Sequence, residues 1–253
     1  MVTLSRKQRE IQQREERILA LARDFLVREG YHGLSMDRIA EALEYSKGTV
    51  YQHFPNKEEI LLALANQAME RRLGLFRRAA SYRARPRFRM AAVGVAAELF
   101  FRLYPYHIQV EQVLRLSSVW EKTSAERRKL LEFCETNCMG IVSGIVRDAV
   151  AAGDLDLAAF GPLAPEQIVF GLWSITFGGY SIAASSPTLS QLGITDPPLV
   201  LRTNCNLLLD GYGWRPLSPE IDLPALWEQI MHEVFAEEWS LVEQKIRGSA
   251  VSG

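Results

Sequence analysis

Apolar residues recur at intervals of three and four along most of the 253-residue chain, which is the period of an amphipathic α-helix. No run of alternating apolar and polar residues bounded by turn residues stands out as a β-strand. The pattern therefore predicts an all-α protein. The expected helices cover residues 14–29, 35–43, 46–54, 56–80, 88–104, 107–119, 124–152, 165–185, 199–213 and 223–246.

Small polar residues mark where several of these helices begin. Ser35 and Ser46 precede the second and third helices, and Asn56 precedes the long fourth one. Their side-chain oxygens can accept hydrogen bonds from the free amides of a first helical turn. Gly30 is expected to end the first helix, because glycine adopts the left-handed conformation that often follows a helix.

An arginine-rich segment with Pro86 interrupts the fourth helix and separates two parts of the chain. Residues 1–64 are expected to form a small three-helix domain, from which the fourth helix continues to about residue 80 as a connector. Residues 65–253 would form a larger helical domain that ends in an extension helix at 223–246. The extension carries an apolar stripe that must pack on its own domain or on a partner, formed by Leu223, Leu226, Trp227, Ile230, Val234 and Leu241.

The composition is that of an ordinary globular protein, with 48% hydrophobic residues, 23% charged residues and a formal net charge of -1. Three cysteines, an odd number without a repeating framework, favour a reduced cytoplasmic protein over a secreted one. The apolar run at 168–184 reaches only the low end of the length of a membrane span. We expect it in a core or a subunit interface and expect no membrane partner.

Charge is distributed unevenly along the chain. Residues 70–90 hold eight arginines and one glutamate, whereas residues 216–253 hold seven acids and two bases. Such asymmetry suits a protein of which one part meets phosphates and another does not. The arginine run at 71–89 could add phosphate contacts, or it could be a solvated helix face.

Residues 35–54 have the pattern of two short helices joined by a tight turn. Apolar residues of the first helix, Ile39 and Leu43, can contact Val50 and Phe54 on the second, and the small Ala40 allows a steep crossing. This is the arrangement of a helix-turn-helix, whose second helix usually enters the major groove of DNA. Two adjacent core helices are the alternative.

Exposed polar residues of the third helix suit contacts with a duplex. Lys47 could donate to guanine acceptors, the Thr49 methyl could contact a thymine methyl, and Gln52 could bind an adenine. The remaining donors, on Tyr51, His53 and Lys57, lie where phosphates would pass.

Residues 14–64 resemble the DNA-binding domain of TetR-family regulators. The resemblance rests on Ile39-Ala40-x-Ala42, Ser46-Lys-Gly-Thr-Val-Tyr51 and His53-Phe54-x-Asn-Lys57-Glu-Glu-Ile-Leu61. One departure is Glu44, where the turn usually has glycine; a positive φ there would cost about 1 kcal/mol. The resemblance implies a DNA-facing set of Ser35, Met36, Lys47, Gly48, Thr49, Tyr51, Gln52, His53 and Lys57.

The resemblance also implies a homodimer with an all-helical regulatory domain that binds a small-molecule inducer. We therefore expect a repressor that a ligand releases from a palindromic operator on double-stranded DNA. The alternatives are a ligand-independent regulator or activator, and a helical carrier or interaction protein without specific DNA binding. No Gly-rich phosphate loop, nucleophile elbow or HExxH pattern occurs, so neither an enzyme nor a cofactor is expected.

The helices at 165–185 and 199–213 are the best candidates for dimer packing, because small residues there would allow close helix contact; the same residues could instead serve the interior of one subunit. They are Gly171, Gly178, Gly179, Ala183 and Ala184. The inducer pocket would be apolar and aromatic. Its candidate residues, each of which could also be ordinary core, are Phe100, Phe101, Tyr104, Trp120, Phe133, Trp173 and Phe177.

Two residue pairs have the i, i+4 spacing of a possible metal or redox site: Cys134 with Cys138, and His107 with Glu111. Neither pair has further ligands nearby in the sequence. We therefore expect buried thiols, a satisfied histidine and no metal.

Overall fold

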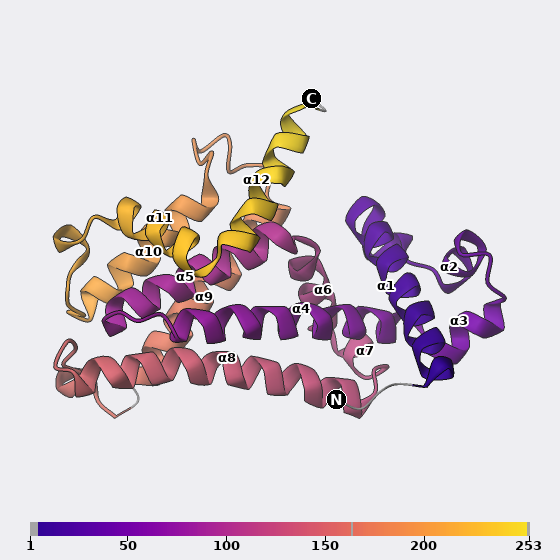
Figure 1. Ribbon diagram of the computed structural model, residues 1–253, viewed down its shortest axis with the longest axis horizontal. Helices are drawn as coiled ribbons and strands as arrows, with labels where there is room; N and C mark the ends of the chain where they lie inside the picture. The colour runs from indigo at the N-terminus through magenta and orange to yellow at the C-terminus, as the bar shows by residue number, and fades with distance from the viewer. Residues whose placement is uncertain (1–4, 163, 252–253) are drawn as a thin grey trace. The chain divides into compact units, whose positions relative to one another are not determined.

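The computed structural model describes residues 5–162 and 164–251. Every regular element in these ranges is helical (Figure 1), which confirms the predicted all-α class. The chain divides into two compact units. The first runs up to Met69 and also includes Tyr106–Phe133, and the second comprises Glu70–Pro105 and the residues from Cys134 on. The domain boundary placed at residue 64 stays a prediction.

The first unit is built from short helices around one core. Its core side chains come mainly from α1 (Arg6–Gly33) and from the first part of α4 (Lys57–Ala80), and the two short helices between them add the fully buried Ile39 and Val50. Its elements are α1 (Arg6–Gly33), α2 (Met36–Ala42), α3 (Lys47–His53), the first part of α4 (Lys57–Ala80), α6 (Tyr106–Leu114), α7 (Ser117–Trp120) and the start of α8 (Ala125–Ala151).

Helix α1 begins eight residues before the predicted start at Arg14, so that prediction was wrong. Ser5 caps the helix: its Oγ accepts from the Gln8 amide at 3.2 Å, and the Gln8 side chain accepts from the Ser5 amide at 2.8 Å. This reciprocal capping explains why a polar segment without an apolar stripe is helical. Gly30 breaks the helix as predicted, with a φ of 69°, but helical backbone resumes up to Gly33.

In the second unit, α5 (Pro86–Leu103) contacts both C-terminal helices, while α9 (Ala164–Ser185) and α10 (Pro197–Gly211) pack on each other. Pro86 occupies the first turn of α5 and is therefore a helix start as well as an interruption. The elements are the end of α4, α5 (Pro86–Leu103), the rest of α8, η1 (Ala158–Phe160), α9 (Ala164–Ser185), α10 (Pro197–Gly211), η2 (Ser218–Glu220), α11 (Leu223–Val234) and α12 (Ala236–Val251).

Two helices predicted as continuous are each divided. The predicted helix at 107–119 forms α6 and α7, and the predicted helix at 223–246 forms α11 and α12, separated at the fully buried Phe235. The proposed stripe consequently ends within α11: Trp227 and Ile230 are buried, whereas Leu241 on α12 is 50% exposed. The spacing of apolar residues continues across both breaks, so the sequence pattern alone could not show where the helix changes direction.

Helix α9 is apolar but not enclosed by its own chain. Its residues Pro165–Ser185 have a mean hydropathy of 1.3, and by length and composition the helix could cross a membrane, yet only 11% of that stretch is buried. Gly171 and Gly179 face α10 of the same chain, because an added Cβ would lie 2.9 Å from Leu208 Cδ2 or 2.1 Å from Leu201 Cδ2. These two glycines therefore allow helix packing within one subunit.

Candidate nucleic-acid interface

Helices α2 and α3 contact each other beside α1 (Figure 1). The buried side chains between them include Ile39, Ala40 and Val50, as the pattern predicted. On the outside, Lys47 Nζ lies 2.7 Å from Asp37 Oδ2 and so joins the two helices. The hydrogen bond with Asp37 raises the pKa of Lys47, which therefore stays protonated in neutral solution.

The turn between α2 and α3 contains Glu44 with a φ of 56°. The Tyr45 amide donates to the Ala40 carbonyl at 2.9 Å and closes the turn. This confirms that the position usually occupied by glycine needs a positive φ here. Glutamate is tolerated because the surrounding helices determine the conformation.

The two predicted serine caps differ. Ser46 accepts a hydrogen bond from the Thr49 amide at 3.1 Å and caps α3 as predicted. Its Oγ also lies 2.8 Å from Thr49 Oγ1, which engages the hydroxyl of Thr49. Ser35 stands at the corresponding position of α2 but makes no side-chain capping bond, so that part of the prediction was wrong.

The residues expected to face DNA differ in exposure. Lys47, Gly48, Tyr51 and Gln52 are exposed along α3. Ser35, Thr49, His53 and Lys57 are partly exposed. Met36 is buried, with 8% of its surface accessible, so its side chain serves the core between the helices. The structure thus brings the exposed members onto one short helix.

Lys57 packs against an aromatic ring of the same unit. Its Nζ lies 4.0 Å from the centroid of the Tyr31 ring, and the Tyr31 hydroxyl donates to Glu58 at 3.1 Å. Burial and the neighbouring Glu58 together raise the pKa of Tyr31 to about 12. Burial alone would raise the pKa of Glu58, but hydrogen bonds from its own amide, Tyr31 and Lys122 lower it overall.

A second buried acid supports the end of α3, and the sequence analysis missed it. Glu59, which is 4% exposed, accepts from the Ser124 amide and lies 3.2 Å from Arg127 Nε. The Arg127 guanidinium in turn lies 5.0 Å from the ring centroid of Phe54, the residue that ends α3. The only signal in the sequence was a pair of acids in the first turn of α4, which a helix dipole alone would explain.

The arginine run at 71–89 is occupied largely by contacts within the second unit. Arg87 is 1% exposed and donates to Asn206 at 3.0 Å and to Asp210 at 3.3 Å. Burial lowers the pKa of Arg87, against the opposing effect of Asp210. Further ion pairs join Arg78 to Glu238, Arg85 to Asp154 and Arg89 to Asp148. These pairings leave little support for phosphate contacts by the run.

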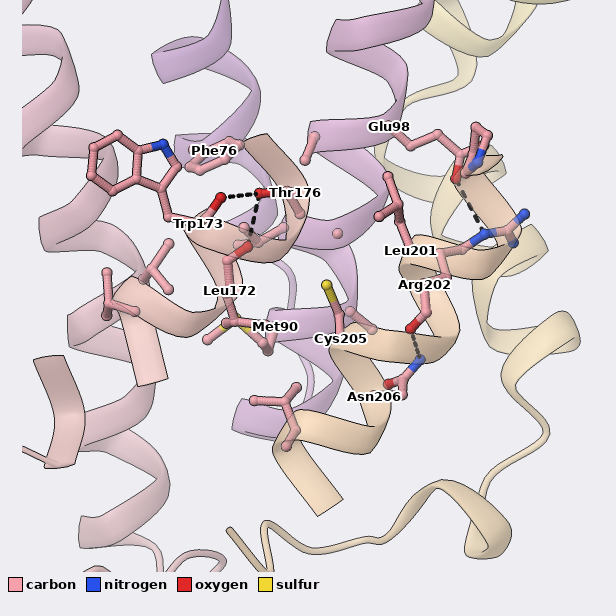
Figure 2. A pocket seen from close by; sticks show the side chains of 18 of the residues that line it. Phe76, Met90, Glu98, Leu172, Trp173, Thr176, Leu201, Arg202, Cys205 and Asn206 are labelled. Atoms are coloured by element: carbon pink, nitrogen blue, oxygen red, sulfur yellow. Dashed lines mark hydrogen bonds and ion pairs between the residues drawn. The ribbon is translucent and has the colours of Figure 1, made fainter. Parts of the chain in front are cut away.

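The second unit contains a cavity of about 90 Å³ between α4, α5, α8, α9, α10 and α11. Figure 2 shows Phe76 and Trp173 on one side of it and Glu98 and Arg202 on the other. Arg202 Nε lies 3.2 Å from Glu98 Oε2. Thr176 donates to the Leu172 carbonyl at 2.8 Å, so its hydroxyl is satisfied within α9. The walls are otherwise mostly apolar, which suits a ligand with an apolar body.

Of the seven aromatic residues proposed for the pocket, Trp173 lines this cavity. Phe100 is fully buried beside Phe101 and Tyr104, and Phe101 stacks on Tyr180 at 3.9 Å between ring centroids. Phe133 is 56% exposed. Trp120 contacts Arg128, and Phe177 contacts Trp173. Aromatic content alone could not distinguish a cavity wall from a core contact, which depends on helix rotation.

The cysteine pair is buried as expected, with Cys134 1% and Cys138 0% exposed. Burial raises the pKa of Cys138 to about 11, so its thiol is protonated and unreactive in neutral solution. His107 is likewise buried, with Nε2 3.4 Å from Glu111. Within residues 5–162 and 164–251, no group of three or more His, Cys, Asp or Glu residues is placed to hold a metal.

Sequence comparison identifies residues 18–64 with the family model of bacterial regulatory proteins of the tetR family. The transcriptional regulator UidR of Escherichia coli is 40% identical over 70 residues, which are 28% of this chain. The chain spans 36% of the length of that relative.

Two solved structures show the same fold over most of the chain. A regulatory protein of the tetR family from Rhodococcus covers 78% of this chain and 96% of its own, with a TM-score of 0.60 and 21% identity. The regulator FadR of Bacillus subtilis in complex with stearoyl-CoA covers 78% and 98%, with a TM-score of 0.57 and 20% identity. These proteins are named as regulators and not as enzymes. Residues 18–64, which hold the helix-turn-helix, thus match the tetR family of bacterial regulatory proteins, and most of the chain shares the fold of the two solved structures.

Proposed function

We propose that the protein is a homodimeric cytoplasmic repressor that binds a palindromic operator through α3 of each subunit and is released by a small apolar ligand. The observation that carries the proposal is the exposed row of donors on α3, held by a buried contact with α2. Specific readout by this motif needs the second helix to enter the major groove.

Base contacts are assigned to the exposed part of α3. Gln52 would bind an adenine. Lys47 would leave its ion pair with Asp37 and donate to a guanine instead. The exchange is easy because an exposed ion pair is weak in water. Tyr51, His53 and Lys57 would contact phosphates, and the Thr49 methyl would contact a thymine. Met36 is left out of the contact set because its side chain is buried.

A homodimer is supported by apolar side chains that α9 and α10 leave exposed. Phe170 is 64% and Leu207 61% exposed, and Ile182 and Leu199 are each more than half exposed. An apolar surface of this kind marks a protein or membrane contact. We assign it to a second copy of this chain, since two recognition helices about 34–36 Å apart would match two half-sites of a palindrome.

The ligand is proposed to occupy the cavity of the second unit. Its walls are mostly apolar, and one structural neighbour is described in complex with stearoyl-CoA, so a ligand with an aliphatic chain fits both observations. Release requires only that the ligand prefer the conformation with low DNA affinity, with a coupling of about 1–3 kcal/mol.

Binding to DNA from the protein's own promoter region tests the proposal by fluorescence anisotropy at several salt concentrations. Gln52→Ala should weaken operator binding about 5- to 150-fold and relax its sequence preference, because one base contact is worth about 1–3 kcal/mol. Gln229→Ala, an exposed glutamine on α11, is the matched control and should bind like the wild type. Lys57→Ala should weaken binding to all sequences alike.

A result without sequence preference or salt dependence would contradict the DNA-binding role. Such a protein, if it still bound an apolar ligand, would be a helical carrier. If no member of a ligand panel changes the operator affinity, the protein is a ligand-independent regulator.

A further inference from the structure

Helix α11 contributes Trp227 to the wall of the cavity, whose other lining residues come from α4, α5, α8, α9 and α10. The side chain is 7% exposed, so the indole is enclosed by the second unit. Its neighbours Leu226 and Ile230 are also buried and anchor α11, which packs against α5. The indole is therefore a fixed wall and not a mobile cover.

Two contacts hold the indole in place. On one side, a Cβ added to Gly94 of α5 would lie 3.0 Å from Trp227 Cη2, so the ring edge reaches the helix backbone. On another side, the Arg202 guanidinium lies 4.7 Å from the ring centroid. Arg202 is itself fixed by its ion pair with Glu98. Glycine at position 94 is thus required for the indole to come this close.

The cavity bounded by this ring is small. An apolar cavity of about 150 Å³ holds one benzene molecule, whereas this one measures about 90 Å³. A long aliphatic chain would therefore extend beyond the space beside Trp227. Three arginines lie at the wall, Arg72, Arg87 and Arg202. Arg87 pairs with Asp210 and Arg202 with Glu98, and guanidinium groups have several donors, so they can also donate to a ligand with an acidic group.

We propose that Trp227 determines ligand specificity by limiting the length of the apolar chain that the cavity accepts, so that short carboxylic acids are preferred over long ones. The inference rests on the proposed ligand-binding role of this cavity. It assigns chain-length selection to the C-terminal helix α11 and to the close approach of Trp227 to Gly94.

The test measures binding of straight-chain saturated carboxylates, from butanoate to hexadecanoate, to the full-length protein by isothermal titration calorimetry. Each methylene that enters an apolar site strengthens binding about fourfold. In the wild type this gain should stop at a short member of the series. In Trp227→Ala it should continue to longer members, and in Gly94→Ala it should stop earlier, because the added methyl group displaces the ring into the cavity.

Trp214→Ala is the matched control, since Trp214 is fully buried in the same unit and does not line the cavity; it should keep the wild-type length limit. If Trp227→Ala does not unfold cooperatively and so is not folded, the chain-length limit of Gly94→Ala tests the proposal instead. An unchanged limit in the variants, or a series of which no member binds the wild type, overturns the proposal. Operator binding measured on the same preparations separates that failure from a failure of the DNA-binding role, because it does not require a ligand.

Discussion

Glu44 is the residue at which the local backbone preference and the fold disagree. Within the described part of the chain, it alone among residues other than glycine has a positive φ, at 56°. The left-handed conformation brings Cβ close to the following carbonyl, which costs about 1–2 kcal/mol for a residue other than glycine. The contacts between α2 and α3 offset this cost, so the turn is strained but stable.

Glu44→Gly should raise the free energy of unfolding by about 0.5–1 kcal/mol, because relief of the left-handed strain exceeds the added entropy of the unfolded chain. Urea unfolding followed by circular dichroism measures the change. Gly30→Ala, at a φ of 69° and a ψ of -170° that essentially only glycine adopts, is the opposite kind of substitution and should lower stability by more than this gain. Equal stability of all three proteins would show that positive φ carries no cost at these turns.

The first turn of α8 is an element that supports the helix-turn-helix from outside the recognized motif. Arg127 contacts Glu59 and Glu15, at 3.2 Å each, and lies over the ring of Phe54. Its backbone carbonyl accepts a hydrogen bond from Asn66 at 3.0 Å. The end of α3 is therefore held by a residue more than 70 positions later in the chain.

Arg127→Ala should destabilise the protein by about 1–3 kcal/mol, since Glu59 would remain buried without its cationic partner. Because Arg127 is partly exposed, the loss of stability should be smaller than for a fully buried ion pair. Guanidinium unfolding of Arg127→Ala beside Lys129→Ala, an exposed neighbour on the same helix, gives the comparison. A loss of equal size in both variants would mean that helix propensity, and not the ion pair, is responsible.

For the whole molecule, the decisive feature is the apolar surface that one chain leaves uncovered. The exposed side chains on α9 and α10 include Phe170 and Leu207, whereas the glycines facing inward serve the contact between these two helices. Within a single chain, α9 and α10 therefore pack on each other, but the apolar side chains on their outer sides stay exposed to water.

Leu207→Glu should convert the proposed dimer to a monomer, because each subunit would bring an unpaired charge into the interface. Analytical ultracentrifugation at micromolar concentration measures the mass, and operator affinity should fall in parallel. Leu116→Glu, at a residue of the first unit that is 54% exposed, should leave the mass unchanged. A dimer that survives Leu207→Glu would place the interface elsewhere.

Those features of the candidate site that depend on residues close together in the sequence could be predicted. The capping of α3 by Ser46, the buried contact of Ile39 with the second helix and the positive φ at Glu44 all depend on residues a few positions apart. The buried position of Met36 was missed, because the resemblance assigns residues by position and not by exposure. Of the aromatic residues proposed for an inducer pocket, Trp173 lines the cavity, whereas Phe76 and Trp227, which also line it, were not proposed.

The sequence by itself determined the helical class, most helix positions and the helix-turn-helix, because helix periodicity, capping and turn conformation are properties of short segments. Only the tertiary structure decided that Arg87 is buried, that Arg127 supports α3, and that α11 ends at Phe235 and places Trp227 against Gly94. Each of these depends on which residues meet across large separations in the chain, and that choice is made by packing of the whole core.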